Sequence, residues 1–241
     1  MKVVILCGGK GLRAFPFTEY LPKPMLPVGG SPIVVQVIKA FIAQGHTDFI
    51  LAAGYRKNVL DDYFEGKNLG AKIQILDTGA NADTGQRVFA CKDYVGDSFI
   101  VTYADGLCDL PIRSLIDFHA THEGLATITS VPMYSQYGVL DVAADGKVIR
   151  LREKPIIREH WINAGFILFD RAVFDHWHGT NLESHVFPHL VSKELAYTYR
   201  HDGFFKSLDS YKDQVELEEM LTSGVLPWAL KEVPNGLLAK S

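Results

Sequence analysis

The sequence predicts an α/β fold in three α/β/α layers, with a mixed central sheet between two layers of helices. Strand and helix patterns alternate over about 130 residues, which is typical of βαβ units and parallel strands. The second half changes character and contains a hairpin pattern, and we expect the whole sheet to be mixed. Of the 241 residues, 47% are hydrophobic and 22% are charged, a composition that can bury a sizeable core.

The first expected element is a strand at residues 3–7, a continuous apolar run that ends at the glycines of residues 8–11. A continuous rather than alternating apolar run indicates a strand buried on both faces. An amphipathic pattern ended by Gly45 predicts a helix at 33–44. Parallel sheets bind ligands where their strands end, so the polar residues after strands are the candidate site. Further strands are expected at 49–53, 72–76, 98–102 and 126–131, and helices at 58–64 and 111–122.

The second half is expected to begin with a hairpin around the turn dipeptide Asp145-Gly146, with strands at 138–142 and 147–151. An acidic helix is expected at 211–223, with Gly224 just past its end. The last residues, 230–241, have weak patterning. The other expected elements are strands at 166–169 and 196–200 and a helix at 184–192.

Charge and composition argue against several classes of protein. The formal net charge of -4 does not fit an electrostatic nucleic-acid binder. No apolar run is long enough for a membrane span, and the one near the N-terminus is too short for a signal peptide. The three cysteines lack metal-binding spacing, which favours buried thiols and a cytoplasmic location. His119 and His122, and His185 and His189, have helical spacing, but no thiolate or carboxylate clusters with them as a third ligand. We therefore expect solvated helix faces rather than zinc sites.

The glycine-rich segment after the first strand is the strongest local signal. Gly8, Gly9 and Gly11 let the backbone approach a ligand closely and turn its N–H groups toward an anion. Arg13 adds a planar, always-charged donor for phosphate oxygens. Neither the G-x-G-x-x-G spacing nor the Walker pattern is present. The glycines alone therefore leave phosphate binding and a structural turn equally open.

A second cluster places Lys23 between two prolines, Pro22 and Pro24. The prolines stiffen the backbone and fix the direction of the lysine side chain, so a flexible cation is held at little further entropy cost. The alternative is a surface lysine on a rigid loop.

Together these segments resemble the signature of the sugar nucleotidyltransferase family. The resemblance rests on a strand followed by GGxGxR and then, about ten residues later, by LPKPMLPVGGSPI. Within the family, the chain is most similar to the glucose-1-phosphate cytidylyltransferases. Over roughly the first 228 residues the other family motifs recur in order. These motifs are Asp77-Thr78-Gly79, Thr84-Gly85-Gln86-Arg87, Tyr103-Ala104-Asp105-Gly106, Glu153-Lys154-Pro155, Ile162-Asn163-Ala164-Gly165-Phe166 and Leu208-Asp209-Ser210.

The resemblance implies a Mg²⁺-dependent reaction in which a sugar phosphate oxygen attacks the α-phosphorus of a nucleoside triphosphate and pyrophosphate leaves. CTP and glucose 1-phosphate are the expected substrates. Catalysis of this kind is mainly positioning and electrostatic stabilisation. Magnesium usually takes one or two carboxylates together with phosphates, a role that Asp105 and Asp209 fit. Without the surrounding motifs, an isolated Asp-Gly is more often a turn.

By resemblance, residues 1–228 form one domain with a Rossmann-like nucleotide-diphospho-sugar transferase fold. Residues 1–130 would bind the nucleotide, 131–228 the sugar phosphate, and 229–241 would be a tail. The implied catalytic residues are Arg13, Lys23, Asp105 and Lys154, and the metal ligands are Asp105 and Asp209. The implied nucleotide-binding residues are Leu6, Gly8, Gly9, Gly11, Arg13, Thr78, Thr84, Gly85, Arg87 and Tyr103. The implied sugar-phosphate-binding residues are Lys23, Tyr137, Gly138, Glu153, Lys154, Asn163 and Gly165.

Departures from the family pattern keep alternatives open. Leu12, Ala104 and Ala164 replace the usual Thr, Gly and Gly of three motifs, and residues 182–188 diverge where acceptor recognition is expected. Another nucleotide, another phosphorylated acceptor or a non-catalytic sensor of nucleotide sugars is therefore possible. Retention of the phosphate and metal groups argues against the sensor. The expected partners are small-molecule substrates, with no nucleic acid and no membrane, and the resemblance implies a homo-oligomer.

Overall fold

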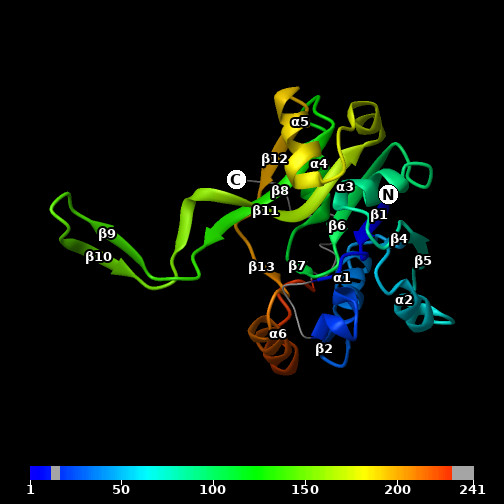
Figure 1. The fold of residues 1–241 in the computed structure, drawn as a ribbon, viewed down its shortest axis with the longest axis horizontal. Helices are drawn as coiled ribbons and strands as arrows, with labels where there is room; N and C mark the ends of the chain where they lie inside the picture. Colours follow the sequence, from blue (N-terminus) through cyan, green and yellow to red (C-terminus); the bar gives the residue numbers. More distant parts are fainter. Residues whose placement is uncertain (12–16, 230–241) are drawn as a thin grey trace, which may run out of the picture.

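The computed structural model describes residues 1–11 and 17–229 (Figure 1). Its centre is a seven-stranded sheet in the order β12-β8-β11-β6-β1-β4-β5. Strand β11 runs antiparallel to both of its neighbours, and every other adjacent pair is parallel. The mixed sheet that the sequence predicts is confirmed. Its strands are β1 (Lys2–Leu6), β4 (Asp48–Ala53), β5 (Lys72–Asp77), β6 (Ser98–Tyr103), β8 (Ala126–Tyr134), β11 (Ile156–Asp170) and β12 (Ala196–Arg200).

Helices cover both faces of this sheet because its central strands are apolar on both sides. Successive side chains of β1 alternate, so Val3 and Ile5 join one core cluster and Val4 and Leu6 the other. The three-layer arrangement is thereby confirmed. The first cluster packs against α1 (Ile33–Ile42), α2 (Lys57–Phe64), α4 (Ile112–His119) and α6 (Tyr211–Ser223), and the second against α3 (Thr84–Ala90) and α5 (Phe187–Ser192).

Some sequence expectations were wrong in extent. The strand expected at 166–169 is only the end of β11, and the helix expected at 184–192 is a π-helical turn, Leu182–Val186, that leads into α5. Helix α3 was not predicted, since it is only seven residues long and contains a glycine. Its signal is the capping box of Asp83 and Gln86, in which each side chain accepts from a backbone N–H near the helix start.

Three two-stranded sheets complete the described part of the chain. They pair β2 (Pro27–Val28) with β3 (Ser31–Pro32), β7 (Gly106–Cys108) with β13 (Phe205–Ser207), and β9 (Val139–Val142) with β10 (Val148–Arg152). Short 3-10 turns lie at Phe17–Glu19, Lys23–Met25 and Arg171–His176. Among the described helices, none is long and apolar enough to cross a membrane.

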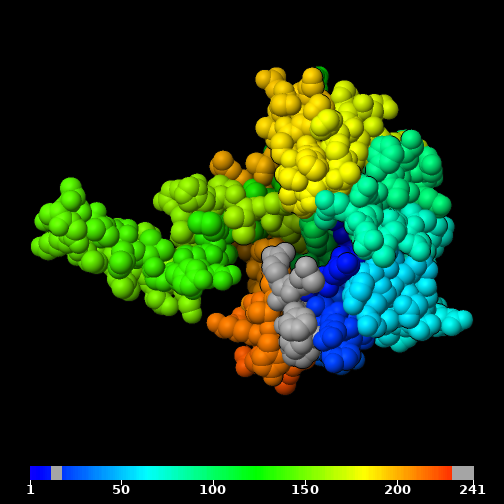
Figure 2. Space-filling view, in the orientation of Figure 1, coloured from blue at the N-terminus to red at the C-terminus, as the bar shows by residue number. Residues whose placement is uncertain are grey.

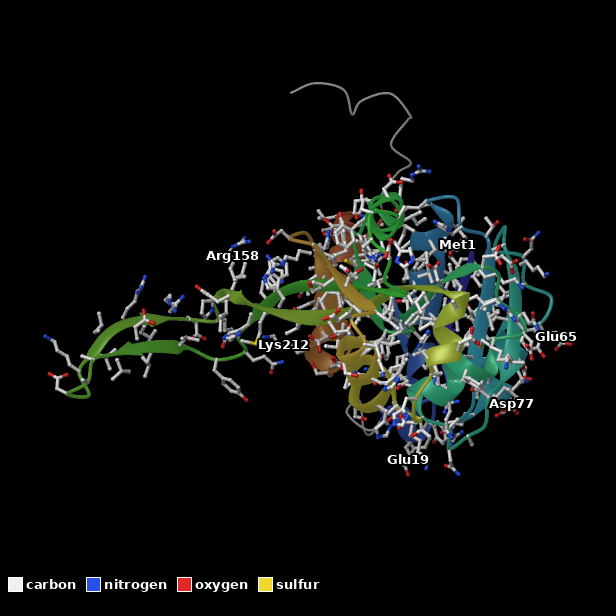
Figure 3. The ribbon with its side chains drawn as sticks, turned by 90° about the horizontal axis from the view of Figure 1, so that it is seen from above. Met1, Glu19, Glu65, Asp77, Arg158 and Lys212 are labelled. Carbon is white, nitrogen blue, oxygen red and sulfur yellow. The ribbon has the colours of Figure 1, made fainter. Side chains whose placement is uncertain are left out.

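The β9–β10 hairpin forms where the sequence predicts it and projects from the body as an arm (Figures 1 and 2). Gly146 takes the positive φ of 89° that its turn requires. The two strands of the arm are also joined by ion pairs, since Asp141 of β9 contacts Arg150 and Arg152 of β10. The arm grows out of β8 and β11, and Arg158 lies near its base (Figure 3).

Candidate functional site

A hollow of about 380 Å³ lies where β1 and β6 end. These two strands are adjacent and Leu6 pairs with Tyr103, so the segments that follow them emerge side by side. Because β4 lies on the other side of β1, the chain order reverses here, as it does at ligand sites of open α/β sheets. The volume is in the range of small-molecule pockets. The predicted residues that line it are Leu6, Gly8, Gly9, Gly11, Lys23, Thr84, Arg87, Tyr103 and Asp105.

The three glycines of the first loop serve different purposes. A Cβ on Gly8 would lie 2.0 Å from the guanidinium of Arg87, so this glycine makes room for an arginine. Gly11 has a φ of 62°, which side-chain-bearing residues rarely adopt. A Cβ on Gly9 would meet nothing within 4 Å, and Gly9 lines the hollow. Arg13, the predicted phosphate donor of this loop, lies outside the described residues.

Arg87 is buried and braces the walls of the hollow. One terminal nitrogen donates to Thr78 Oγ1 at 2.7 Å, to Gly79 O at 2.8 Å and to Ala53 O at 3.2 Å. The other terminal nitrogen donates to Gly8 O at 2.8 Å. Burial lowers the pKa of this guanidinium. The residue that the sequence predicts as a nucleotide contact therefore holds together the backbone of three loops.

Thr84 and Tyr103 meet at Glu183, which sequence reasoning missed. The Thr84 hydroxyl donates to one carboxylate oxygen of Glu183 at 3.0 Å, and the Tyr103 hydroxyl donates to the other. Glu183 lies in the π-helical turn, a conformation frequent at functional sites. The only signal in the sequence was that residues 182–188 depart from the family pattern.

Two predicted nucleotide-binding residues pack behind the walls of the hollow. The Thr78 hydroxyl donates to Ala53 O at 2.6 Å while it accepts from Arg87. A Cβ on Gly85 would lie 2.8 Å from Thr180 O, so the start of α3 is pressed against that loop. In the described part of the chain, neither residue is among those that line the hollow.

Lys23 joins the two aspartates that the sequence predicts as metal ligands. Its ammonium lies 2.5 Å from Asp105 Oδ2 and 2.8 Å from Asp209 Oδ1, although Asp209 is 186 residues away along the chain. The short 3-10 turn at Lys23–Met25 begins after Pro22 and directs the side chain inward, where the residue is 9% exposed. Burial opposes the charge of this lysine, but both carboxylates stabilise it and the net effect raises the pKa of Lys23.

The same two carboxylates fit a divalent cation. One oxygen from each already converges on a single cationic group, and the second oxygen of Asp209 accepts from Ser207 Oγ at 2.7 Å. Hard oxygen ligands of this kind are those that Mg²⁺ prefers. Asp105 and Asp209 could therefore hold a metal ion together with the phosphates of a ligand.

The predicted sugar-phosphate residues fall into two groups. Asn163 and Gly165 lie beside the hollow, since Asn163 Oδ1 accepts from Gly165 N at 2.8 Å and a Cβ on Gly165 would lie 2.6 Å from the Tyr103 ring. The other group lies at the base of the arm, with Lys154 Nζ 3.9 Å from Glu153 Oε1. A Cβ on Gly138 would lie 3.1 Å from Glu153 Oε2, and Tyr137 is 78% exposed. The structure shows no contact between this group and Lys23 among the described residues.

The expectation for His119 was wrong, because this side chain is buried rather than solvated. Its Nδ1 lies 2.7 Å from Thr127 Oγ1, and Nε2 of His122 lies 2.8 Å from the same hydroxyl. Helix α4 packs this face against β8. The prediction of buried free thiols is confirmed for Cys7, Cys91 and Cys108.

Known proteins are similar to this chain along most of its length. The pattern of the nucleotidyl transferase family matches residues 2–204. The probable glucose-1-phosphate cytidylyltransferase of Bacillus subtilis is 34% identical over 95% of the chain and 99% of its own length. The glucose-1-phosphate cytidylyltransferase of Salmonella typhimurium is 33% identical over 95% and 98%. The mannose-1-phosphate guanyltransferase of Hypocrea jecorina is 31% identical over 88% of the chain and 62% of its own length.

Solved structures share the fold at lower sequence identity. HddC from Yersinia pseudotuberculosis in complex with GMP-PN superposes with a TM-score of 0.72 at 22% identity, over 91% of this chain and 99% of that one. A UDP-glucose pyrophosphorylase in complex with UDP-glucose has a TM-score of 0.70 at 17% identity, over 92% and 98%.

Proposed function

We propose that this chain, which belongs to the nucleotidyl transferase family, transfers CMP from CTP to glucose 1-phosphate and releases pyrophosphate. The observation that carries the proposal is the convergence of Lys23, Asp105 and Asp209 beside a glycine loop at the ends of β1 and β6. Sugar-1-phosphate nucleotidyl transfer is the activity of the relatives that match along almost the whole chain. The two cytidylyltransferases among them support CTP and glucose 1-phosphate as substrates.

The glycine loop would hold the triphosphate. Gly9 presents an open backbone to the hollow, and Gly8 is kept in place by the Arg87 guanidinium. Backbone N–H groups in such a loop bind phosphate oxygens. Arg13 would add a planar charge close to the leaving pyrophosphate. Thr84 and Tyr103 would form the nucleoside side of the pocket, with Glu183 fixing both hydroxyls.

Lys23 would stabilise the charge that develops on the non-bridging oxygens of the α-phosphate. Its ammonium is buried and directed by contacts to Asp105 and Asp209, so little reorganisation is needed when a phosphate replaces one of these carboxylates as its partner. Mg²⁺ bound by Asp105 and Asp209 would supply positive charge to the phosphate oxygens. When the substrate enters, the two aspartates would thus exchange the Lys23 ammonium for Mg²⁺ as their cationic partner.

The acceptor would bind between Asn163-Gly165 and the residues at the base of the arm. Lys154 has an exposed ammonium for a sugar phosphate and a φ of 44° that fixes its backbone in the left-handed region. Gly138 and Gly165 let the Glu153 carboxylate and the Tyr103 ring pack against the backbone beside the acceptor. We expect Lys154→Met to raise the KM for glucose 1-phosphate by at least tenfold, with little change in the KM for CTP, because a charged hydrogen bond contributes about 1.5–3 kcal/mol.

The direct test is pyrophosphate release with Mg²⁺, using CTP, UTP, dTTP, GTP and ATP in turn against glucose 1-phosphate. We expect CTP to give the highest rate. Asp105→Asn should lower this rate by two orders of magnitude or more, whereas Asp202→Asn, at an exposed ion pair, should leave it unchanged. Equal rates with all five triphosphates would contradict the assignment of CTP.

A second candidate is guanylyl transfer to mannose 1-phosphate. The observation that favours it is the match to mannose-1-phosphate guanyltransferases at about the same identity as the cytidylyltransferases. The chain covers only 62% of the length of these relatives, however, against 99% for the Bacillus subtilis protein. Adding mannose 1-phosphate to the panel with GTP decides between the two. The homo-oligomer implied by the family resemblance stays a prediction, which gel filtration with light scattering can check.

A further inference from the structure

The two metal-binding aspartates flank a short ladder of strands. Asp105 immediately precedes β7, and Asp209 follows soon after β13. Among the described strands these two pair only with each other, with Gly106 opposite Ser207 and Cys108 opposite Phe205. The N–H of Leu208 extends the ladder by donating to Asp105 O at 2.9 Å. The spacing between the two carboxylates therefore depends on how β13 lies against β7.

The far end of this ladder is closed by a pair of side chains. His201 Nε2 lies 2.5 Å from Asp109 Oδ1, and His201 is 9% exposed. In a hydrogen bond between these two atoms the ring N–H donates and the carboxylate oxygen accepts. The N–H of Asp109 donates to Phe204 O at 3.1 Å, and the N–H of His201 donates to Ser130 O of β8 at 2.8 Å. His201 thus connects the ladder to the central sheet.

Gly203 packs its backbone directly against the hydrogen bond between His201 and Asp109. A Cβ at this position would lie 2.3 Å from Asp109 Oδ1 and 2.6 Å from His201 Nε2. At these distances a side chain at 203 would displace one or both of these groups from their hydrogen bond. Only glycine at 203 lets the loop between β12 and β13 pass over the hydrogen bond.

A metal centre is the less suitable interpretation of this cluster. The sulfur of Cys108 lies within 4.8 Å of the Asp109 and His201 donors, so the three could in principle share an ion. Burial raises the pKa of Cys108 to about 12, which keeps its thiol protonated, and only the thiolate binds metals well. The His201–Asp109 hydrogen bond already uses the remaining two groups.

We propose that His201 and Asp109 are positioning residues that hold β13 in register against β7 and so set the separation of Asp105 and Asp209 for a divalent cation. In this role neither residue contacts the cation or the substrates. The proposal rests on the proposed function, since it assigns the metal to those two aspartates. Groups that hydrogen-bond metal ligands directly typically change metal affinity by 10–100-fold when they are replaced. His201 and Asp109 act one step farther away, so we expect the lower end of this range.

The test is a Mn²⁺ titration of the nucleotide-free protein, followed by the electron paramagnetic resonance signal of free Mn²⁺. We expect Asp109→Ala to weaken Mn²⁺ binding about tenfold. Asp109→Asn should weaken it less, because an amide oxygen still accepts from His201. Gly203→Ala keeps both partners and separates them, so it should also weaken binding. The Mg²⁺ concentration for half-maximal pyrophosphate release should shift by the same factor, with the KM for CTP unchanged.

The matched control is His119→Gln, which disrupts another buried histidine contact, to Thr127 and Asp170, with no link to β7 or β13. It should lower the melting temperature without changing Mn²⁺ affinity. Mn²⁺ binding within twofold of wild type in Asp109→Ala would overturn the proposal. So would a wild type that binds no Mn²⁺, or wild-type binding that Asp105→Asn leaves unchanged. If the wild type releases no pyrophosphate from CTP, the proposed substrates are wrong, and the Mn²⁺ titration still decides the positioning role.

Discussion

Replacement of Arg87 tests whether this residue contacts the nucleotide directly or holds the structure of the site. The side chain is 3% exposed and donates to Gly8 O, Gly79 O, Ala53 O and Thr78 Oγ1. If the main function of Arg87 is to hold the surrounding loops, Arg87→Ala destabilises the protein even when no nucleotide is bound. If its main function is to contact the nucleotide, the stability of the free protein hardly changes.

The expected loss follows from these bonds. A hydrogen bond from a charged donor contributes about 1.5–3 kcal/mol. The total is less than the sum, because Tyr55 N still donates to Gly8 O and because burial of the guanidinium is itself unfavourable. We expect Arg87→Ala to lower the free energy of unfolding by about 3 kcal/mol, which corresponds to about 6–12 °C in a chain of this size. Arg87→Lys can satisfy only some of the acceptors and should lose roughly half as much.

The assay is thermal unfolding of wild type and both variants, without ligand and with CTP and Mg²⁺. We expect the order wild type, Arg87→Lys, Arg87→Ala in the absence of ligand. The variants should also have a higher KM for CTP, because the Gly8 backbone is less well held. A ligand-free melting temperature for Arg87→Ala within 2 °C of wild type would refute the reasoning.

Three further predictions concern the lysine, the glycines and the thiols. Lys23→Met should lower kcat about 10²–10³-fold in a pyrophosphate assay while the far-UV circular dichroism is unchanged. Gly8→Ala should lower the melting temperature, because its Cβ would meet a buried guanidinium, whereas Gly9→Ala should leave the melting temperature unchanged and raise the KM for CTP. Burial raises the pKa of Cys91 and Cys108 to about 12, so alkylation at pH 8 should modify them only in the unfolded protein. The unfolded thiols ionise first, near their ordinary pKa of 9.0, so the free energy of unfolding should fall as the pH rises from about 9 toward 12.

Much of the fold could be predicted because the patterns that specify it are local. The continuous apolar run of β1 and the hairpin around Gly146 lie where the sequence placed them. The start of β11 could not be found in this way, since its first residues pair with β8 outside the core and are largely exposed. Helix α3 is short and is held by tertiary contacts, so its periodicity was too weak to recognise.

The candidate site was predicted less evenly than the fold. Lys23, Asp105 and Asp209 meet in one cluster, and their roles toward the reacting phosphate stay predictions. Arg87 has a structural position that its place in a motif did not reveal, and Glu183 was missed. Lys154 lies at the base of the arm, where its ammonium pairs with Glu153, and among the described residues the structure shows no contact between it and Lys23 or Asp105. The division of the chain near residue 130 stays a prediction, and Asp209 shows that the later part contributes to the same cluster as Lys23.

The sequence by itself determined the order and type of most elements, the family and the residue types of the site. These follow from periodicity, turn residues and motifs, which are readable within a few neighbouring positions. Only the tertiary structure decided which of those residues meet. Lys23 reaches Asp209 across 186 residues, and Tyr103 and Thr84 share Glu183, because the sheet order and the β7–β13 register bring their strand ends together. Contacts of this kind depend on packing between distant segments, which no local pattern records.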